Sequence, residues 1–207
     1  MKILHPVYLI FILSAILSSC KKDEATPSNN SQPTSNLANT HFKFSLEMDG
    51  QQYSAEDGLN GYYHFTFPIE HDSANFINWT NLSIFSNNDT SSAVFEIIRS
   101  KWKGMADPMN VDDFRQFFYP GNHNFSTHPD SGIVIVFGTN SNTNYSSGSG
   151  YDQSGSNFLV TDTLTETDAL GPYFKFKALF NCKVYDQQGN QKIITNGTVV
   201  CKFQQFQ

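Results

Sequence analysis

The sequence has few charged residues and little cysteine, and these shortages exclude several classes of function. Charged side chains make up 15% of the 207 residues, and 13 lysines and arginines are outnumbered by 19 acidic residues. A nucleic-acid-binding protein needs a basic patch to contact phosphates, so this composition argues against nucleic acid as a partner. The three cysteines include no CxxC pair of the kind that builds zinc sites.

Motifs of familiar enzymes are also missing. The chain has no HExxH, no EF-hand loop and no GxSxG, so we expect no metal, no cofactor and no assignable catalytic residue. The adjacent acids Asp112 and Asp113 fit the first turn of a helix better than a glycosidase pair. His123 and His128 lie near Asp130 and form one candidate grouping, although loop histidines explain them as well. We expect a non-enzyme, with a cell-envelope hydrolase that lacks a recognisable motif as the alternative.

One apolar run is present, at the N-terminus. A positively charged start precedes residues 3–17, a stretch too short to span a hydrocarbon core, which needs roughly 20 apolar residues. This arrangement is typical of a secretory signal. Residues 17–20 read Leu-Ser-Ser-Cys and resemble the lipobox of bacterial lipoproteins. The resemblance implies that residues 1–19 are removed and that acyl chains on Cys20 anchor the protein in a membrane. An ordinary signal peptide with an incidental cysteine is the alternative.

The residues after Cys20 give a second indication of location. Lys22, Asp23 and Glu24 resemble the Lys-acidic-acidic signal that sends lipoproteins of Bacteroidota to the outer face of the outer membrane. A solvated charge cluster at the start of a tether is the alternative. Residues 25–40 are mostly Pro, Ser, Thr and Asn, which cannot bury enough apolar surface to fold. We therefore expect residues 20–40 to be a lipidated, disordered tether.

The remaining residues, 41–207, have the length of one domain. Apolar residues alternate with polar ones over 42–48, and Asp49-Gly50 is a strong hairpin signal. Further strands are predicted at 63–69, 76–86, 93–100, 132–139, 157–165 and 173–185, with more after residue 190. Eight to ten short strands separated by turn signals predict an all-β, antiparallel β-sandwich. A short amphipathic helix is expected near residues 110–119.

The domain resembles the small β-sandwich lipoproteins common in Bacteroidota. Three short features carry the resemblance: an alternating strand followed by Asp-Gly and an aromatic residue at 44–53, Pro120-Gly121, and Thr-Asn-Gly-Thr at 195–198. The resemblance implies a fold and an outer-membrane location, and it implies no activity.

Candidate ligand-binding residues are aromatic. Residues 140–157 combine Tyr, Ser, Gly and Asn, the composition of antibody contact loops, with Tyr145 and Tyr151 as the expected anchors. A mobile loop with incidental tyrosines is the alternative. If exposed, Trp79 and Trp102 would stack on sugar rings, although tryptophan in a sandwich usually lies in the core. We expect a binding or accessory module, with carbohydrate as the first candidate ligand and an envelope protein as another.

Cys182 and Cys201 are the two thiols left once Cys20 is acylated. An even number outside the cytosol suggests a disulfide. A simple hairpin at residues 186–190, however, places Cys182 opposite Thr195 and Cys201 roughly 20 Å further along the strand. We therefore expect two buried free thiols, with a disulfide as the alternative.

Overall fold

Strands are the only regular elements in the residues that the computed structural model describes, which are 36–67, 79–86, 94–100, 119–126, 132–138, 143–148 and 150–204. The strands are β1 (Lys43–Met48), β2 (Gln51–Glu56), β3 (Tyr62–Phe67), β4 (Trp79–Ser86), β5 (Val94–Ser100), β6 (Gly121–His123), β7 (Ile133–Gly138), β8 (Asn144–Ser146), β9 (Asn157–Asp168), β10 (Gly171–Tyr185) and β11 (Gln191–Gln204). All strand pairs are antiparallel, so the predicted all-β fold is confirmed. Residues 110–118, where the helix was expected, lie outside the described residues.

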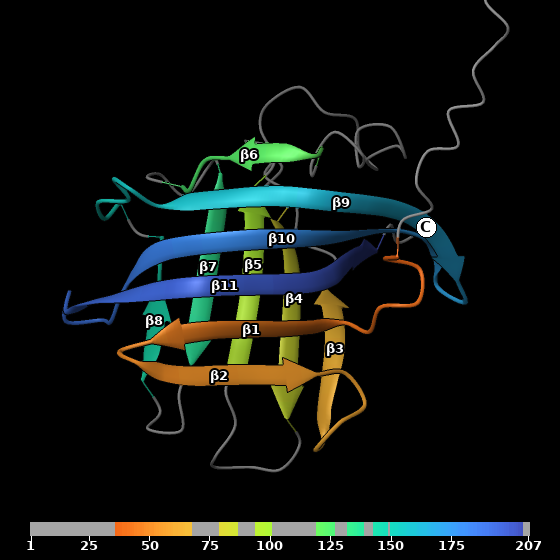
Figure 1. Cartoon of the computed structure of the whole chain (residues 1–207), viewed down its shortest axis with the longest axis horizontal. Helices are drawn as coiled ribbons and strands as arrows, with labels where there is room; N and C mark the ends of the chain where they lie inside the picture. Colours follow the sequence, from red (N-terminus) through yellow and green to blue (C-terminus); the bar gives the residue numbers. More distant parts are fainter. Residues whose placement is uncertain are drawn as a thin grey trace, which may run out of the picture. The chain divides into compact units, whose positions relative to one another are not determined.

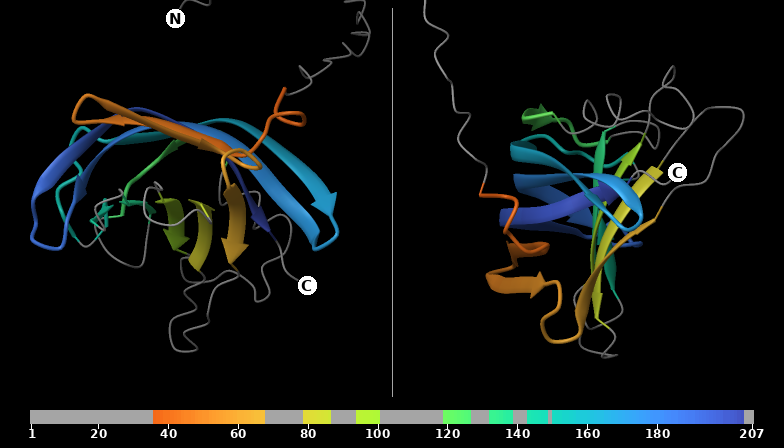
Figure 2. Two further views of the ribbon diagram at one scale, coloured as in Figure 1. Left: turned by 90° about the horizontal axis from the view of Figure 1, so that it is seen from below. Right: turned by 90° about the vertical axis from the view of Figure 1, so that its right-hand side faces the viewer.

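The strands form one sheet that folds over on itself. Its order is β2-β1-β11-β10-β8-β7-β5-β4-β3, and β9 and β6 continue from the other side of β10. Strands β9, β10, β11, β1 and β2 lie side by side, and the strands from β8 to β3 run crosswise behind them (Figure 1). We call these layers the front sheet and the back sheet; the front sheet arches over the back sheet (Figure 2). The two layers are compatible with the predicted sandwich.

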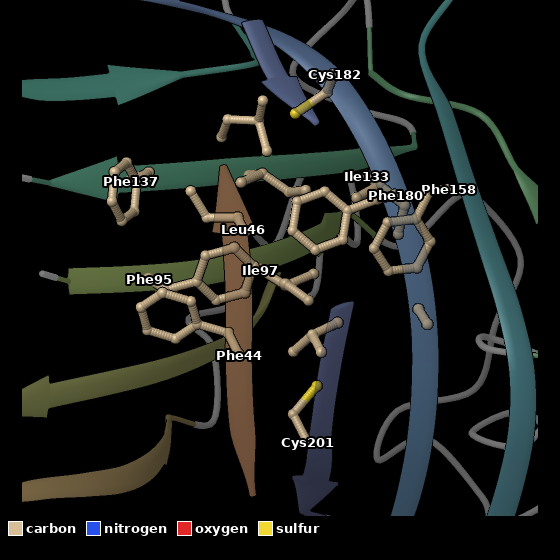
Figure 3. Packing of buried hydrophobic residues seen from close by; sticks show 14 of the residues in the cluster. Phe44, Leu46, Phe95, Ile97, Ile133, Phe137, Phe158, Phe180, Cys182 and Cys201 are labelled. Carbon is tan, nitrogen blue, oxygen red and sulfur yellow. The ribbon is translucent and has the colours of Figure 1, made fainter. Parts of the chain in front are cut away.

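Phenylalanines fill the space between the layers (Figure 3). Phe44 of β1 stacks on Phe95 of β5 with ring centroids 4.8 Å apart, and Phe95 lies 5.6 Å from Phe180 of β10. The period of two along each strand places these side chains on one face, where they are almost completely buried. Burying a side chain of this size contributes about 1.5–3 kcal/mol, so these aromatic contacts join the two sheets.

Strand β11 contains a bulge at Asn196 and Gly197. Asn196 adopts a positive φ of 53°, and the pairing with β10 shifts between Phe180 and Cys182. A side chain at Gly197 would place its Cβ only 2.5 Å from the Phe180 ring, so only glycine fits there. The strand therefore continues past the bulge instead of turning.

This geometry determines the position of the cysteines. Cys182 pairs with Ile194, one residue from the expected partner Thr195, because the hairpin pairs Tyr185 with Gln191. Cys201 lies much further along β11, opposite Phe176. Both thiols are free and buried, as expected, and lie apart in the core (Figure 3). Burial raises the pKa of both thiols, which makes them poor nucleophiles.

The folded part of the chain begins before residue 41, earlier than the sequence indicated. Residues 36–39 form a turn, in which Leu37 is only 2% exposed. The Lys175 ammonium donates a hydrogen bond to the carbonyl of Ala38 (3.2 Å) and lies over the Phe42 ring. The polar composition of the expected tether gave no sign of this contact, in which burial of Leu37 helps to hold residues 36–39 on the domain.

Strand β3 presents its aromatic face outward. Tyr63 and Phe65 are 38% and 39% exposed, whereas His64 stacks on Phe42 with centroids 4.3 Å apart. Burial and, to a smaller extent, the positive charge of Lys202 lower the pKa of His64 to about 3. The ring is therefore neutral at ordinary pH, and its Nε2 has no hydrogen-bond partner in the described part of the chain.

Candidate functional site

A cleft of about 450 Å³ lies where β9 begins and β10 ends. One wall is formed by residues 123–125 at the end of β6, and the other by residues 150–154 and Ser156, which lead into β9. Strand β6 pairs with β9 through His123 and Phe158, and this pairing fixes the first wall. The second wall, residues 150–156, is called the cleft loop below.

Gln153 fixes the shape of the cleft loop. Its side-chain amide donates to the carbonyls of Ser147 (3.0 Å) and Lys183 (2.7 Å). Its Oε1 accepts hydrogen bonds from the Ser156 hydroxyl (2.7 Å) and from the backbone N–H of Lys183 (3.3 Å). One side chain thus ties the loop to β10 and to the segment after β8. Residues 150–156 are therefore held in a defined arrangement by hydrogen bonds to the neighbouring segments, and such an arrangement offers a ligand a defined surface.

Asp152 of the cleft loop forms an ion pair with Lys183 of β10. The Lys183 ammonium donates to its Oδ2 (2.5 Å), and the backbone N–H of Ser154 donates to its Oδ1 (2.9 Å). The hydrogen bond from Lys183 is the main reason that the pKa of Asp152 falls to about 2, and the bonds from Ser154 contribute as well. The carboxylate is therefore ionised over the whole physiological range, as an acceptor and not as an acid.

Tyr151 is supported from behind by a buried tyrosine. Its ring stacks on the ring of Tyr185, with centroids 4.3 Å apart and planes 18° apart. Tyr185 is 8% exposed, and its single O–H is shared between the carbonyl oxygen of Asp152 (2.9 Å) and Gln191 Oε1 (3.1 Å). Tyr151 itself is half-buried and lines the cleft. Stacking fixes its orientation, so little side-chain entropy remains to be lost on binding.

The stacked tyrosines begin two copies of one short pattern, Tyr-Asp-Gln-x-Gly, at residues 151–155 and 185–189. Gly155 and Gly189 adopt nearly the same positive φ, 81° and 83°. The first copy forms most of the cleft loop, and the second forms the β10–β11 turn. This pattern was not among the features predicted from the sequence, although it occurs twice in the chain.

His123 is held by Tyr119, which lies just before β6. It is 4% exposed, its Nε2 donates to the carbonyl of Tyr119 (2.8 Å), and its ring lies 4.5 Å from the Tyr119 ring. His128 and Asp130, its expected neighbours, lie outside the described residues. His123 and Asp152 both line the cleft, but His123 is engaged with Tyr119, and Asp152 with Lys183. This arrangement favours holding a ligand over transferring a proton.

The other predicted contact residues lie elsewhere. Tyr145 is 8% exposed and belongs to the core, with the Lys192 ammonium 5.0 Å above its ring, so it is no exposed anchor. Trp79 is the first residue of β4, but its side chain is outside the described part. Outside the described residues lie Trp102, Asp112, Asp113, Cys20, Lys22, Asp23 and Glu24. Tyr151 is the predicted contact residue that the structure places in the cleft.

No family model matches the chain, and no similar protein is found among curated proteins or solved structures. Over the described ranges, no three His, Cys, Asp or Glu side chains come together as metal ligands. The same part of the chain contains no helix that is long and apolar enough to cross a membrane. The function must therefore be inferred from the chemistry of the cleft and of the N-terminal segment.

Proposed function

We propose that this protein is an outer-membrane lipoprotein, facing the cell exterior, whose β-domain binds carbohydrate. The observation that carries the binding proposal is the ordered cleft: an aromatic ring fixed by stacking lies beside fixed polar groups. Sites for small molecules combine apolar or aromatic walls with a few placed polar groups in this way. The proposal of a lipid anchor is based on Cys20, and the proposal that the protein faces outward is based on Lys22, Asp23 and Glu24.

Carbohydrate suits the residue types in the cleft. A sugar presents C–H bonds on the faces of its ring and hydroxyl groups around its edge. The Tyr151 ring supplies an apolar surface, and the Asp152 carboxylate, the Ser154 hydroxyl and the Asn124 amide supply hydrogen-bonding partners. The Asp152 carboxylate is balanced by the Lys183 ammonium and provides no free charge to attract a charged ligand, so we propose an uncharged sugar.

A cell-envelope hydrolase is the second candidate, because a histidine and a carboxylate line the same cleft. In that case His123 would have to leave the carbonyl of Tyr119, or Asp152 would have to leave Lys183, before either could act on a substrate. Turnover of bound oligosaccharide that persists in repurified protein and is lost in His123→Ala would favour this candidate.

A glycan array tests the binding proposal. The mature protein should bind uncharged oligosaccharides, and Tyr151→Ala should reduce this binding at least tenfold because the stacking surface is lost. Tyr63→Ala is the matched control, because Tyr63 is an exposed tyrosine that does not line the cleft. Binding that is unchanged in Tyr151→Ala, or that is equally weakened in both variants, would refute the cleft as the site.

The anchor is tested separately in cells. Cys20→Ala should abolish metabolic labelling with a fatty-acid analogue and leave the precursor uncleaved. Normal labelling and processing of this variant would show that Cys20 carries no lipid.

A further inference from the structure

Five polar side chains form a continuous row across the outer face of the front sheet. They come from five neighbouring strands, in the order β2, β1, β11, β10 and β9, which lie side by side in Figure 1. We call them the amide row: Gln52, Glu47, Asn196, Asn181 and Asn157. Register places Gln52 opposite Glu47, and Asn181 opposite Asn157. Asn196 is the residue of the β11 bulge that lies between Glu47 and Asn181.

Hydrogen bonds hold the amide row in a fixed arrangement. The Glu47 carboxylate accepts from the side chains of Gln52 (2.9 Å) and Asn196 (3.2 Å). Asn181 accepts from the backbone N–H of Asn196 (3.0 Å) and donates from its own amide to Asn157 Oδ1 (2.9 Å). All but Glu47 are exposed, yet each takes part in this chain of bonds. A polar surface ordered before binding loses less entropy when a ligand arrives.

A groove of about 360 Å³ lies beside the row at the β2 end. Its lining includes three hydroxyl side chains that stand opposite one another on adjacent strands: Ser54 on β2, Ser45 on β1 and Thr198 on β11. Lys43 and Glu56, an ion pair 3.8 Å apart, also line the groove. Ser54 is two residues from Gln52, so the hydroxyls lie next to the amide row on the same face.

The opposite end of the row meets the cleft. Asn157 directly follows Ser156, which lines the cleft. On β10, Lys183 lies two residues beyond Asn181 on the same face, and its ammonium bonds Asp152 and Ser154 of the cleft loop. Groove, amide row and cleft thus follow one another across the outer face of the front sheet, with the exposed side chains of Leu179 and Ile193 beside the row. Four spacings between five strands make the row about 19 Å long.

We propose that this surface binds one extended, uncharged glycan chain, which runs along the amide row between the groove and the cleft. The chemistry of the row carries the choice of ligand: amides and hydroxyls match sugar hydroxyls, and they repeat at the strand spacing. The charges argue against an acidic chain, because the Glu47 carboxylate lies within the row and the groove's Lys43 is paired with Glu56. This inference rests on the proposed function, since one end of the same chain occupies the cleft.

The test is binding of the mature protein to an array of neutral oligosaccharides, printed as graded length series of several linkages, with acidic oligosaccharides alongside. Affinity should rise with length until the chain covers the row and then level off. Gln52→Ala and Asn157→Ala, at the two ends of the row, should each weaken the longest chains about five- to tenfold, the effect of about one hydrogen bond. The shortest chains, held by the cleft, should bind these variants normally.

Gln51→Ala is the matched control, because Gln51 is an exposed glutamine on the same strand whose side chain points to the opposite face. It should bind every length as the wild type does. Short-chain binding that depends on Tyr151 but does not tighten with length would overturn the amide row and leave the cleft intact. Unchanged long-chain binding by both row variants, or preference for acidic chains, would overturn it equally. Absence of all binding would refute both this inference and the proposed function.

Discussion

Two turns of this protein share the sequence Tyr-Asp-Gln-x-Gly and have different roles. In residues 151–155 and in residues 185–189, the aspartate Oδ1 accepts the backbone N–H two residues later, from Ser154 and Gln188, each at 2.9 Å. The glycine that follows has a positive φ in both. Local sequence thus produces the same local structure twice.

The two turns differ in the hydrogen-bond partners of their side chains. Asp186 bonds within its own turn, to the backbone N–H and the side chain of Asn190, and closes the β10–β11 hairpin. Asp152 is instead bound by Lys183, and Gln153 ties its turn to Ser147 and Lys183. The comparison teaches that the pattern specifies a turn, whereas the residues it contacts on other strands make one copy a wall of a cleft.

The stacked tyrosines provide the largest contrast. Tyr185→Ala should lower the free energy of unfolding by about 3–5 kcal/mol, because it empties a buried site and removes the hydroxyl shared between Asp152 and Gln191. Tyr151→Ala should lower the free energy of unfolding by only about 1 kcal/mol, since its ring is half-exposed. The same variant should nevertheless bind the ligand at least tenfold more weakly. Urea denaturation of both variants measures the difference. Equal losses would mean that the two rings play the same structural part.

The glutamines at the third position should differ almost as much. Gln153→Ala removes the four hydrogen bonds that fasten the cleft loop, so we expect a loss of about 2–3 kcal/mol and faster amide hydrogen exchange in residues 150–156. Gln187→Ala, at the equivalent place in the other turn, should be within about 0.5 kcal/mol of the wild type because Gln187 is exposed. A Gln153→Ala variant as stable as Gln187→Ala would refute the anchoring role.

The glycines should behave alike. Gly155→Ala and Gly189→Ala each force alanine into a left-handed conformation, at a cost of about 1–2 kcal/mol. Neither meets a steric obstacle: the Cβ at 155 has no neighbour within 4 Å, and that at 189 lies 3.6 Å from the Tyr151 hydroxyl. Thermal melts of the two variants should therefore coincide. A much larger loss at one site would show that the two turns differ in backbone strain.

Substitution of the aspartates should change Tm least. The change should depend on pH and, for one of the two, on salt. A pKa of about 2 for Asp152 lies below that of the unfolded chain, 3.8, so its contribution is present above pH 4 and is lost as the pH falls towards 2. Asp152→Asn should therefore lower Tm slightly at pH 7 and not at pH 2. Added salt should reduce the difference in Tm between Asp152→Asn and the wild type at pH 7, because the charge of Lys183 accounts for part of this difference. Asp186→Asn should show the acid dependence without the salt dependence, since its partners are uncharged.

Local features of the fold were readable from the sequence. The alternation over 42–48 and the Asp49-Gly50 signal predicted β1 and its turn, and both turn residues have the positive φ, 55° and 75°, that such a turn requires. The long β10 and the buried free thiols were also predicted correctly. These features depend on neighbouring residues, or on the periodicity of a single strand.

Features that depend on distant partners were missed. A period of two shows that Tyr63 and Phe65 share a face, but not that this face is exposed. Tyr145 was expected in a contact loop and is buried, because the three-residue β8 pairs with both β7 and β10. The position of the amide row depends on a bulge in β11, whose effect on register no local pattern reveals. For the site, the sequence identified Tyr151 and the residues around it but not their partners.

An NMR titration of the mature protein with an uncharged oligosaccharide from the array tests the central claim most directly. The two turns offer equivalent reporters, the hydrogen-bonded amides of Ser154 and Gln188. The account predicts that the ligand shifts the Ser154 signal, together with the side-chain amides of Asn124 and Asn157, and leaves Gln188 in place. Shifts that are equal at both turns, or confined to residues outside the cleft and the amide row, would contradict it.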